Sequence, residues 1–435
     1  MRNFGLIYWY EVRKITERKF LRLAFTIIII INLLINLHSI IDYSVGSRGA
    51  DMMVINQYGR QILDRKAFLK GEVIFRYVDD AGNVMEEKVG PMEYICRVRE
   101  YAMRWSGTVL DDRTIGELQD FLDQYNYHDG KGYSYGWSFQ NFYWVWESIR
   151  LIGLNPQSAD VSEVFIRQHM EEQWKYIMDA EQLTKAERAF WDTCPKPEIP
   201  LKMAYVPGFD NLINKTKMTH IMLLLFVIIS LCSSFSEDRE RRLSQISQAT
   251  SKGSSAAVFA RLCAGETIVL AAGAALYLSS ALVQFGIFGR DGFAAPLQLI
   301  SGMVWSRMKV TAGQGAMLLC ACSMLICLMM GAITMFLSQL MQSSIAALAG
   351  CNTFLLVTLA YDYQIFCENR VLSQIVSYLP VHRIGPEFLY DERLVPLAGR
   401  LVPAIPFSIG IYLLITFLSL AACAGLAILG RQDKR

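Results

Sequence analysis

The sequence lacks the short motifs that mark several large classes of enzyme. It contains no G-x-x-x-x-G-K-[ST] loop for holding phosphates, no H-E-x-x-H pair for a zinc peptidase and no G-x-S-x-G elbow for a serine hydrolase. Its five histidines are scattered without the spacing of metal ligands. We therefore expect no catalytic residue, no metal site and no cofactor held by this chain.

The ten cysteines do not suggest a metal site either. Seven lie in apolar runs, where cysteine behaves as a small hydrophobic residue. Cys320 and Cys322 have no histidine or second cysteine pair at ligand spacing. Cys96 and Cys194 lie in a polar part of the sequence, where a disulfide between them is possible and sequence alone does not test it.

Charge is scarce and unevenly spread. Only 19% of the 435 residues are charged, against about 25% in soluble domains. Residues 43–217 nevertheless hold 26 of the 40 acidic residues and 21 of the 42 basic ones. The pattern predicts an acidic soluble domain between basic membrane flanks.

Long apolar runs make up much of the remainder. A helix needs roughly 20 mostly apolar residues to cross the hydrocarbon core of a bilayer. Six segments meet this length: Phe20–Ile41, Met218–Phe235, Val258–Phe285, Gly315–Met341, Ile345–Ile365 and Ile405–Leu429. The apolar part of the first is longer than that of a signal peptide and no small-residue cleavage site follows directly, so we interpret it as an uncleaved anchor.

The orientation follows from the basic residues near the span ends. Lys and Arg cluster before the first span, between the second and third, and after the last. Six crossings place these clusters on one side, which predicts that both termini are cytoplasmic. Residues 43–217, 286–314 and 366–404 then face outside. Residues 1–19 carry an apolar stripe opposite a basic face, the pattern of a helix lying in the membrane interface, with a soluble helix as the alternative.

Residues 43–217 predict a mostly helical domain with a small β element. Helical periodicity is clear in residues 162–178, Thr184 and Glu187 form a capping-box pattern, and residues 71–89 alternate as a hairpin would. An aromatic patch lies within the same domain and includes Tyr133, Tyr135, Trp137, Trp144 and Trp146. It is domain core, a surface resting on the outer leaflet, or a binding face for a peptide, glycan or lipid headgroup.

Few polar groups interrupt the predicted spans. Glu266 lies near the start of the third span and Asp362 near the outer end of the fifth. Ionisable residues inside a membrane are candidates for function, although both lie close enough to an interface to reach water. Asn352, also in the fifth span, is interpreted as a hydrogen-bonding group between helices.

The segment 236–257, between the second and third spans, holds the most specific pattern. Ser234 and Glu237 form a capping-box pattern for a short charged helix, and Leu243 and Ile246 supply two apolar contacts one helical turn apart. Such a helix suits a groove on a partner protein, and a solvated charged loop is the alternative.

This segment resembles the coupling loop of permease subunits of type 2 ABC transporters, particularly the Gram-positive exporters. A Glu, a Leu-rich turn, Thr-Lys-x-Gly and a basic residue entering the third span occur in the same order; they are Glu237, Leu243, Ile246, Thr250, Lys252, Gly253 and Arg261. Ser251 and Ser254 depart from residues common in that family. The segment Leu183–Trp191 also resembles a stretch that precedes the second span in these exporters.

The resemblance implies a mainly α fold with six spans, an N-terminal interfacial helix and a mostly helical extracellular domain between the first two spans. It also implies a multi-pass subunit in the cell membrane of a Gram-positive bacterium that exports a peptide, lipid or other envelope-active substrate. ATP and Mg would be bound by a separate cytoplasmic subunit, and a second permease subunit would complete the pathway. We expect the lipid bilayer as a partner and no nucleic acid. The alternative is a membrane-anchored sensor or immunity protein that binds a ligand outside without transport.

Overall fold

The computed structural model describes residues 2–46, 53–55, 61–63, 73–78, 84–103, 106–109, 111, 113–114, 163–180, 183–196, 201–240, 254–303, 306–341, 343–361, 378–390, 394–397 and 399–429. The chain divides into two compact units. We call residues 1–33, 215–280 and 318–435 the helical unit, and residues 34–214 and 281–317 the second unit.

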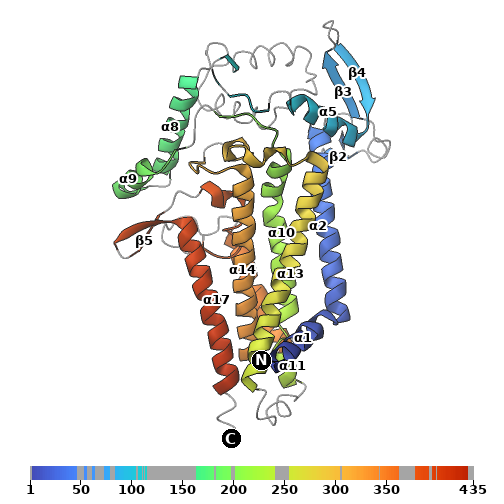
Figure 1. The fold of residues 1–435 in the computed structure, drawn as a ribbon, viewed down its shortest axis with the longest axis vertical. Helices are drawn as coiled ribbons and strands as arrows, with labels where there is room; N and C mark the ends of the chain where they lie inside the picture. The colour runs from blue at the N-terminus through green and yellow to red at the C-terminus, as the bar shows by residue number, and fades with distance from the viewer. Residues whose placement is uncertain are drawn as a thin grey trace. The chain divides into compact units, whose positions relative to one another are not determined.

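The fold is mainly helical (Figure 1). The long helices are α1 (Arg2–Thr16), α2 (Lys19–Gly46), α10 (Pro207–Leu231), α13 (Ser254–Phe288), α14 (Ala312–Leu340), α15 (Ser344–Tyr361) and α17 (Ala404–Leu429). A short helix, α11 (Ser236–Glu240), follows α10 after a turn, and the hairpin of β5 (Leu394–Leu397) and β6 (Arg400–Pro403) precedes α17.

Among the described residues, five helices are long and apolar enough to cross a membrane: α2, α10, α13, α14 and α17. They coincide with five of the six predicted spans. The apolar part of α15 runs over Ser344–Leu359, about 24 Å of helix, which is shorter than the roughly 30 Å of a bilayer core. The fifth predicted span, Ile345–Ile365, therefore stays a prediction, and Asp362 near its outer end lies outside the described residues.

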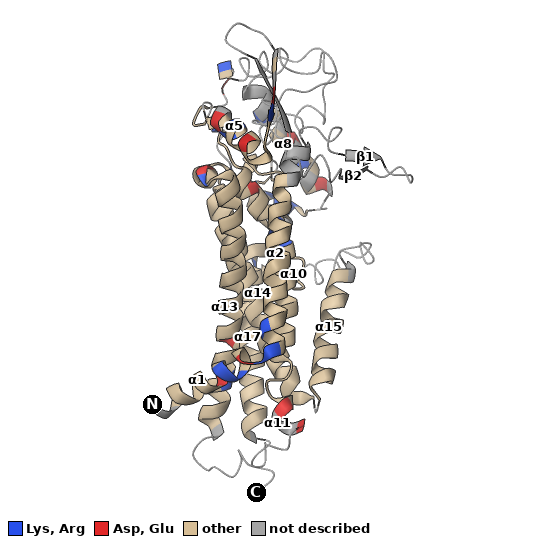
Figure 2. Cartoon of the chain, turned by 90° about the vertical axis from the view of Figure 1, so that its right-hand side faces the viewer, with Lys and Arg blue, Asp and Glu red and all other residues tan. Residues whose placement is uncertain are grey.

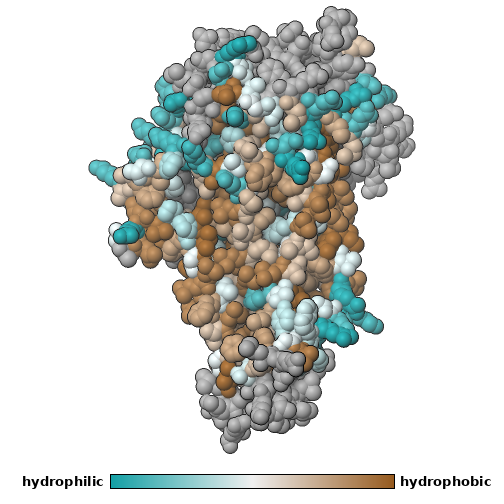
Figure 3. All heavy atoms as spheres, in the orientation of Figure 1, coloured by the Kyte–Doolittle hydropathy of each residue, from teal (hydrophilic) through white to brown (hydrophobic). Residues whose placement is uncertain are grey.

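The outer faces of α2 and α17 are apolar. Large exposed side chains include Leu23, Ile27 and Leu34 on α2, and Leu414 and Phe417 on α17. Hydrophobic residues cover these helices on the face shown in Figure 3. In Figure 2 the ribbons of the helical unit carry few charges along their length, and charged residues gather near α1 and α11. Helix faces of this kind are compatible with contact to lipid rather than water.

Inside the helical unit, polar side chains join the helices to one another. The amide of Asn32 in α2 donates to the Leu276 carbonyl at 3.3 Å and to Ser280 Oγ at 2.9 Å, and it accepts from Thr219 Oγ1 at 2.9 Å. These bonds tie α2 to α13 and α10. The hydrophobic core around them combines residues of α10, α13 and α14, among them Leu223 and Val269.

The second unit confirms several local predictions. Strands β3 (Val73–Val78) and β4 (Val84–Val89) form the predicted antiparallel hairpin, and α8 (Glu163–Ala180) is the predicted helix. Helix α9 (Lys185–Thr193) begins with the predicted capping box, in which Thr184 and Glu187 exchange hydrogen bonds between side chain and backbone. A further pair of short strands, β1 (Met53–Ile55) and β2 (Gln61–Leu63), is also antiparallel.

Charged side chains fasten other parts of the second unit. Arg97 of α5 (Pro91–Met103) pairs with Glu87 of β4 and with Glu93, and the hydrogen bond from Arg97 holds the pKa of Glu87 below its ordinary value. Arg307 is buried with its guanidinium over the rings of Trp174 and Trp191, where its charge faces two aromatic surfaces.

The sequence did not decide whether Cys96 and Cys194 form a disulfide. Cys96 and Cys194 are both free thiols in the structure, Cys96 exposed and Cys194 half-buried. The aromatic patch, which comprises Tyr133, Tyr135, Trp137, Trp144 and Trp146, lies outside the described residues, so its role stays a prediction.

Candidate functional site

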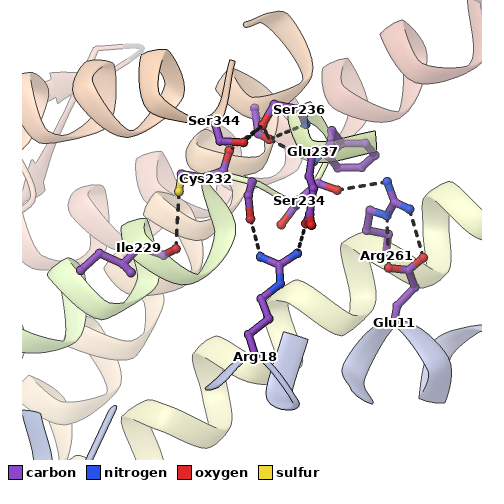
Figure 4. A network of polar contacts seen from close by, with 12 residues as sticks. Glu11, Arg18, Ile229, Cys232, Ser234, Ser236, Glu237, Arg261 and Ser344 are labelled. Carbon is purple, nitrogen blue, oxygen red and sulfur yellow. Dashed lines mark hydrogen bonds and ion pairs between the residues drawn. The ribbon is translucent and has the colours of Figure 1, made fainter. Parts of the chain in front are cut away.

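The candidate site lies in the helical unit, around the turn that joins α10 to α11. Two arginines hold this turn, Arg18 from one side and Arg261 from the other (Figure 4). We call Glu11, Arg18, Ser233, Glu237 and Arg261 the charged network. It includes Glu237, at the start of the predicted coupling segment 236–257.

Arg18 occupies the break between α1 and α2, where the chain leaves one helix and enters the next. Its guanidinium donates to Ser233 Oγ and to the carboxylate of Glu237, and the side chains of Arg18 and Glu237 are largely buried. A charge-assisted pair of this kind fixes direction as well as distance, because the fork of the guanidinium has two donors. The first residues of α11 are thereby linked to the joint between α1 and α2.

Arg261, in the second turn of α13, forms the other half of the network. It donates to both carboxylate oxygens of Glu11, Nε to Oε2 at 3.3 Å and Nη2 to Oε1 at 3.1 Å. Its third donor, Nη1, reaches the carbonyl of Ser234 at 3.0 Å, and its guanidinium lies 5.1 Å from the ring centre of Phe235. Arg261 therefore joins α1, α13 and the turn before α11.

Helix α1 lies along α13 through this pair. The hydroxyl of Tyr8 donates to Thr267 Oγ1 at 2.9 Å, one helical turn from the Glu11 pair on α1. Glu11 is only 6% exposed and Ile15 only 4%, whereas Phe4 of the predicted apolar stripe is exposed. The buried face of α1 thus centres on Glu11, because the carboxylate finds two donors there. The helix is confirmed, and its position in a membrane interface stays a prediction.

Serines connect the same turn to α14 and α15. The backbone N–H groups of Phe235 and Ser236 donate to Ser338 Oγ at 3.0 and 3.1 Å, and Ser236 Oγ lies 2.9 Å from Ser344 Oγ. Glu240 accepts from the backbone N–H of Ser344 at 2.5 Å, at the start of α15. A displacement of α11 would therefore change contacts made by helices α10, α13, α14 and α15 as well as α1.

The predicted capping box of Ser234 and Glu237 is wrong. The backbone N–H of Glu237 already donates to the Ser233 carbonyl at 3.2 Å, since the chain turns from α10 into α11 without an extended cap residue. Ser234 Oγ is buried without a hydrogen-bond partner. The Glu237 carboxylate instead accepts from Arg18, so its role is an ion pair between helices rather than a cap.

The remaining predicted residues of the coupling segment are not in view. Leu243, Ile246, Thr250, Lys252 and Gly253 lie outside the described residues; of the segment 236–257 the structure describes residues 236–240 and 254–257. The sequence pattern indicated Glu237 and Arg261 but not their partners Glu11 and Arg18. An acidic residue on the apolar side of α1 was the available signal for Glu11.

The polar residues predicted within the spans lie elsewhere in the helical unit. Glu266 is on α13, with both carboxylate oxygens buried and without a hydrogen-bond partner. Asn352 is half-buried on α15. Neither contributes to the charged network, and no described group of three His, Cys, Asp or Glu residues is placed to hold a metal ion. Comparisons with protein-family models, with curated proteins and with solved structures find no match to this chain.

Proposed function

We propose that this chain is the membrane-spanning permease subunit of an ATP-driven exporter of the type 2 ABC class. A separate ATP-binding subunit would supply the energy, and a second permease subunit would complete the pathway. The proposal includes six spans, with α15 as the fifth, and an outer domain formed by residues 43–217. The exported substrate would be a peptide, a lipid or another envelope-active molecule.

The observation that carries the proposal is the pair of ion pairs on either side of the turn before α11. A coupling loop has to transmit a movement of the ATPase to the spans, and a loose connection would absorb that movement. Arg18 to Glu237 and Arg261 to Glu11 join the start of the segment 236–257 to α1, α2 and α13. These are the contacts that a mechanical link between loop and helices needs.

The mechanism follows from where Arg18 lies. When two ATPase subunits close, they would push the segment that begins at Glu237. The force would pass through Glu237 to Arg18, in the break between α1 and α2, so that α2 tilts while α1 rests on the membrane surface. The serine contacts of Ser236 would carry the same push to α14 and α15. The chain itself would make and break no covalent bond.

Charge reversal tests this link. The chain is co-expressed with a candidate partner subunit that carries a G-x-x-x-x-G-K-[ST] motif, and ATP hydrolysis by the purified complex is measured in lipid vesicles. Glu237→Arg places two cations together and is expected to reduce the hydrolysis that depends on the permease at least tenfold. The double variant Arg18→Glu with Glu237→Arg restores an ion pair, and it should recover a substantial part of the activity.

A matched control lies one turn away. Arg13 and Glu17 form an exposed i,i+4 ion pair at 2.6 Å, and exposed pairs contribute little. Exchanging these two charges should leave hydrolysis unchanged. A folded chain that binds no ATPase, or a complex indifferent to Glu237→Arg, contradicts the proposal. Ligand binding by the outer domain of such a chain would then favour the sensor or immunity function.

A further inference from the structure

The carboxyl group of Glu266 is buried without a hydrogen-bond partner. It lies on α13, where both of its carboxylate oxygens are enclosed by protein and have no hydrogen-bond partner. Gly331 of α14 provides the space: a Cβ added there would lie 3.4 Å from Glu266 Oε1 and still closer to side-chain carbons of Leu231 and Val269. The carboxyl therefore faces apolar atoms at the packing of α13 against α14.

Glu11 provides the contrast within the same unit. Glu11 is only 6% exposed, and Arg261 donates to both of its oxygens. Arg261 stands five residues before Glu266 on α13 and is committed to Glu11 and Ser234. Among the described residues, no Lys or Arg pairs with Glu266. An ionised carboxylate that is buried without a donor or a cation is strongly disfavoured, so these surroundings tolerate the neutral acid.

Other polar side chains lie on the same packed helices. Cys327 is one turn before Gly331 on α14, and its Sγ is 3.7 Å from His220 Nδ1 on α10. His220 Nδ1 and the hydroxyl of Tyr277 on α13 both contact Ser323 Oγ, and His220 Nε2 is buried without a partner. These residues form a string of polar groups inside an otherwise apolar core.

A proton fits this position better than a metal ion. Hard metal ions take six or more oxygen ligands, or at least several carboxylates and carbonyls. Among the described residues no group of three His, Cys, Asp or Glu is placed to hold a metal ion, and side-chain carbons of Leu231 and Val269 lie at Gly331 together with Glu266 Oε1. A proton needs one oxygen and adds no coordination demand.

We propose that Glu266 is a proton-binding site inside the helical unit, held as a neutral carboxylic acid and able to exchange its proton. The inference goes beyond the proposed function and stands without it, because it depends only on the packing of α10, α13 and α14. The same protonated carboxyl is expected whether the chain is an exporter, a sensor or any other membrane protein with this core.

A carbodiimide tests the protonation directly. Dicyclohexylcarbodiimide is an apolar reagent that reacts with the acid form of a carboxyl: the acid proton goes to one nitrogen, the carboxyl oxygen bonds to the central carbon, and the acyl group then migrates to nitrogen. The product retains every atom of both reactants. Peptide mass spectrometry of the purified full chain in detergent is expected to find this adduct on Glu266 at pH 7.

The matched control is Glu11 in the same sample, both of whose carboxylate oxygens accept from Arg261, so it should stay unlabelled. A water-soluble carbodiimide should leave Glu266 unlabelled. Sodium or potassium ions that protect Glu266 at constant pH would show a metal ion as the occupant and overturn the proposal. Equal labelling of Glu11 and Glu266 would also overturn it, since pairing would then make no difference.

Infrared spectroscopy measures the protonation of Glu266 without any chemical label. At neutral pH a protonated carboxyl gives a C=O stretch that ionised surface carboxylates lack. The difference between wild type and Glu266→Gln should contain this band, and the band should shift in D2O if the proton exchanges. A folded Glu266→Gln variant whose difference spectrum has no acid band contradicts the proposal, and an acid band that does not shift in D2O contradicts the exchange.

Discussion

Removing the carboxylate of Glu11 should destabilise the helical unit strongly, because it leaves the buried Arg261 without its partner. The substitution Glu11→Leu takes away two charge-assisted hydrogen bonds, at 3.1 and 3.3 Å, and leaves Arg261 enclosed. The side chains of Arg261 and Glu11 are only 15% and 8% exposed, so water replaces the lost partner poorly. Breaking a buried ion pair from one side costs about 3–5 kcal/mol. Arg261 keeps the Ser234 carbonyl and the Phe235 ring, which places the expected loss at about 3 kcal/mol.

The assay is reversible unfolding of the purified chain in mixed micelles, followed by tryptophan fluorescence. Glu11→Leu and Arg261→Met are measured singly and together. The double variant should recover to within about 1 kcal/mol of wild type, because a buried ion pair can be replaced by apolar residues of similar volume at little cost. Glu17→Leu, which breaks only the exposed pair with Arg13, should cost less than about 1 kcal/mol. If Glu11→Leu costs no more than Glu17→Leu, the pair does not hold α1 to α13 and the reasoning fails.

Two further predictions concern the second unit and the C-terminal helix. A Cβ at Gly208 would lie 2.3 Å from the carbonyl oxygen of Gly289, so Gly208→Ala should lower the free energy of unfolding by about 1–3 kcal/mol in the same assay. A Cβ at Gly410 in α17 meets open space, so Gly410→Ala should be neutral or stabilising by up to about 1 kcal/mol. If Gly410→Ala destabilises the chain more than Gly208→Ala does, the close approach of Gly208 to the Gly289 carbonyl is refuted. Arg97 lowers the pKa of Glu87, so this pair stabilises the fold above the ordinary pKa of 4.5, and its contribution is lost as the pH falls through the lower folded value. A fall in unfolding temperature between pH 5 and 3 that is no larger in wild type than in Glu87→Gln would contradict this.

The long helices were predictable because each is encoded by its own run of residues. α2, α10, α13, α14 and α17 each contain a long, mostly apolar segment, and a helix is the simplest way for such a segment to satisfy its backbone inside a bilayer. The hairpin of β3 and β4 and the cap at Thr184 were predictable for the same reason, since the pattern is local.

The charged network was not predictable as a whole, since its pairs are distant in the sequence. Arg18 and Glu237 are 219 residues apart, and Glu11 and Arg261 are 250 apart. Single residues were identified from the coupling-loop pattern, but their partners depend on how α1 packs. The capping pattern at Ser234 and Glu237 gave a wrong prediction, because the same residue types also form ion pairs. The burial of the Glu266 oxygens likewise depends on other helices, on which Gly331 and Leu231 lie.

The most direct test of the proposed function is permease-dependent ATP hydrolysis in a reconstituted complex. The chain and its ATP-binding partner are assembled in vesicles, and the vanadate-sensitive rate is compared for wild type, Glu237→Arg and the double variant with Arg18→Glu. The account predicts a stoichiometric complex, a rate at least tenfold lower for the single variant and a substantial recovery for the double. A stable, folded chain that forms no such complex, or equal rates for all three proteins, would contradict it.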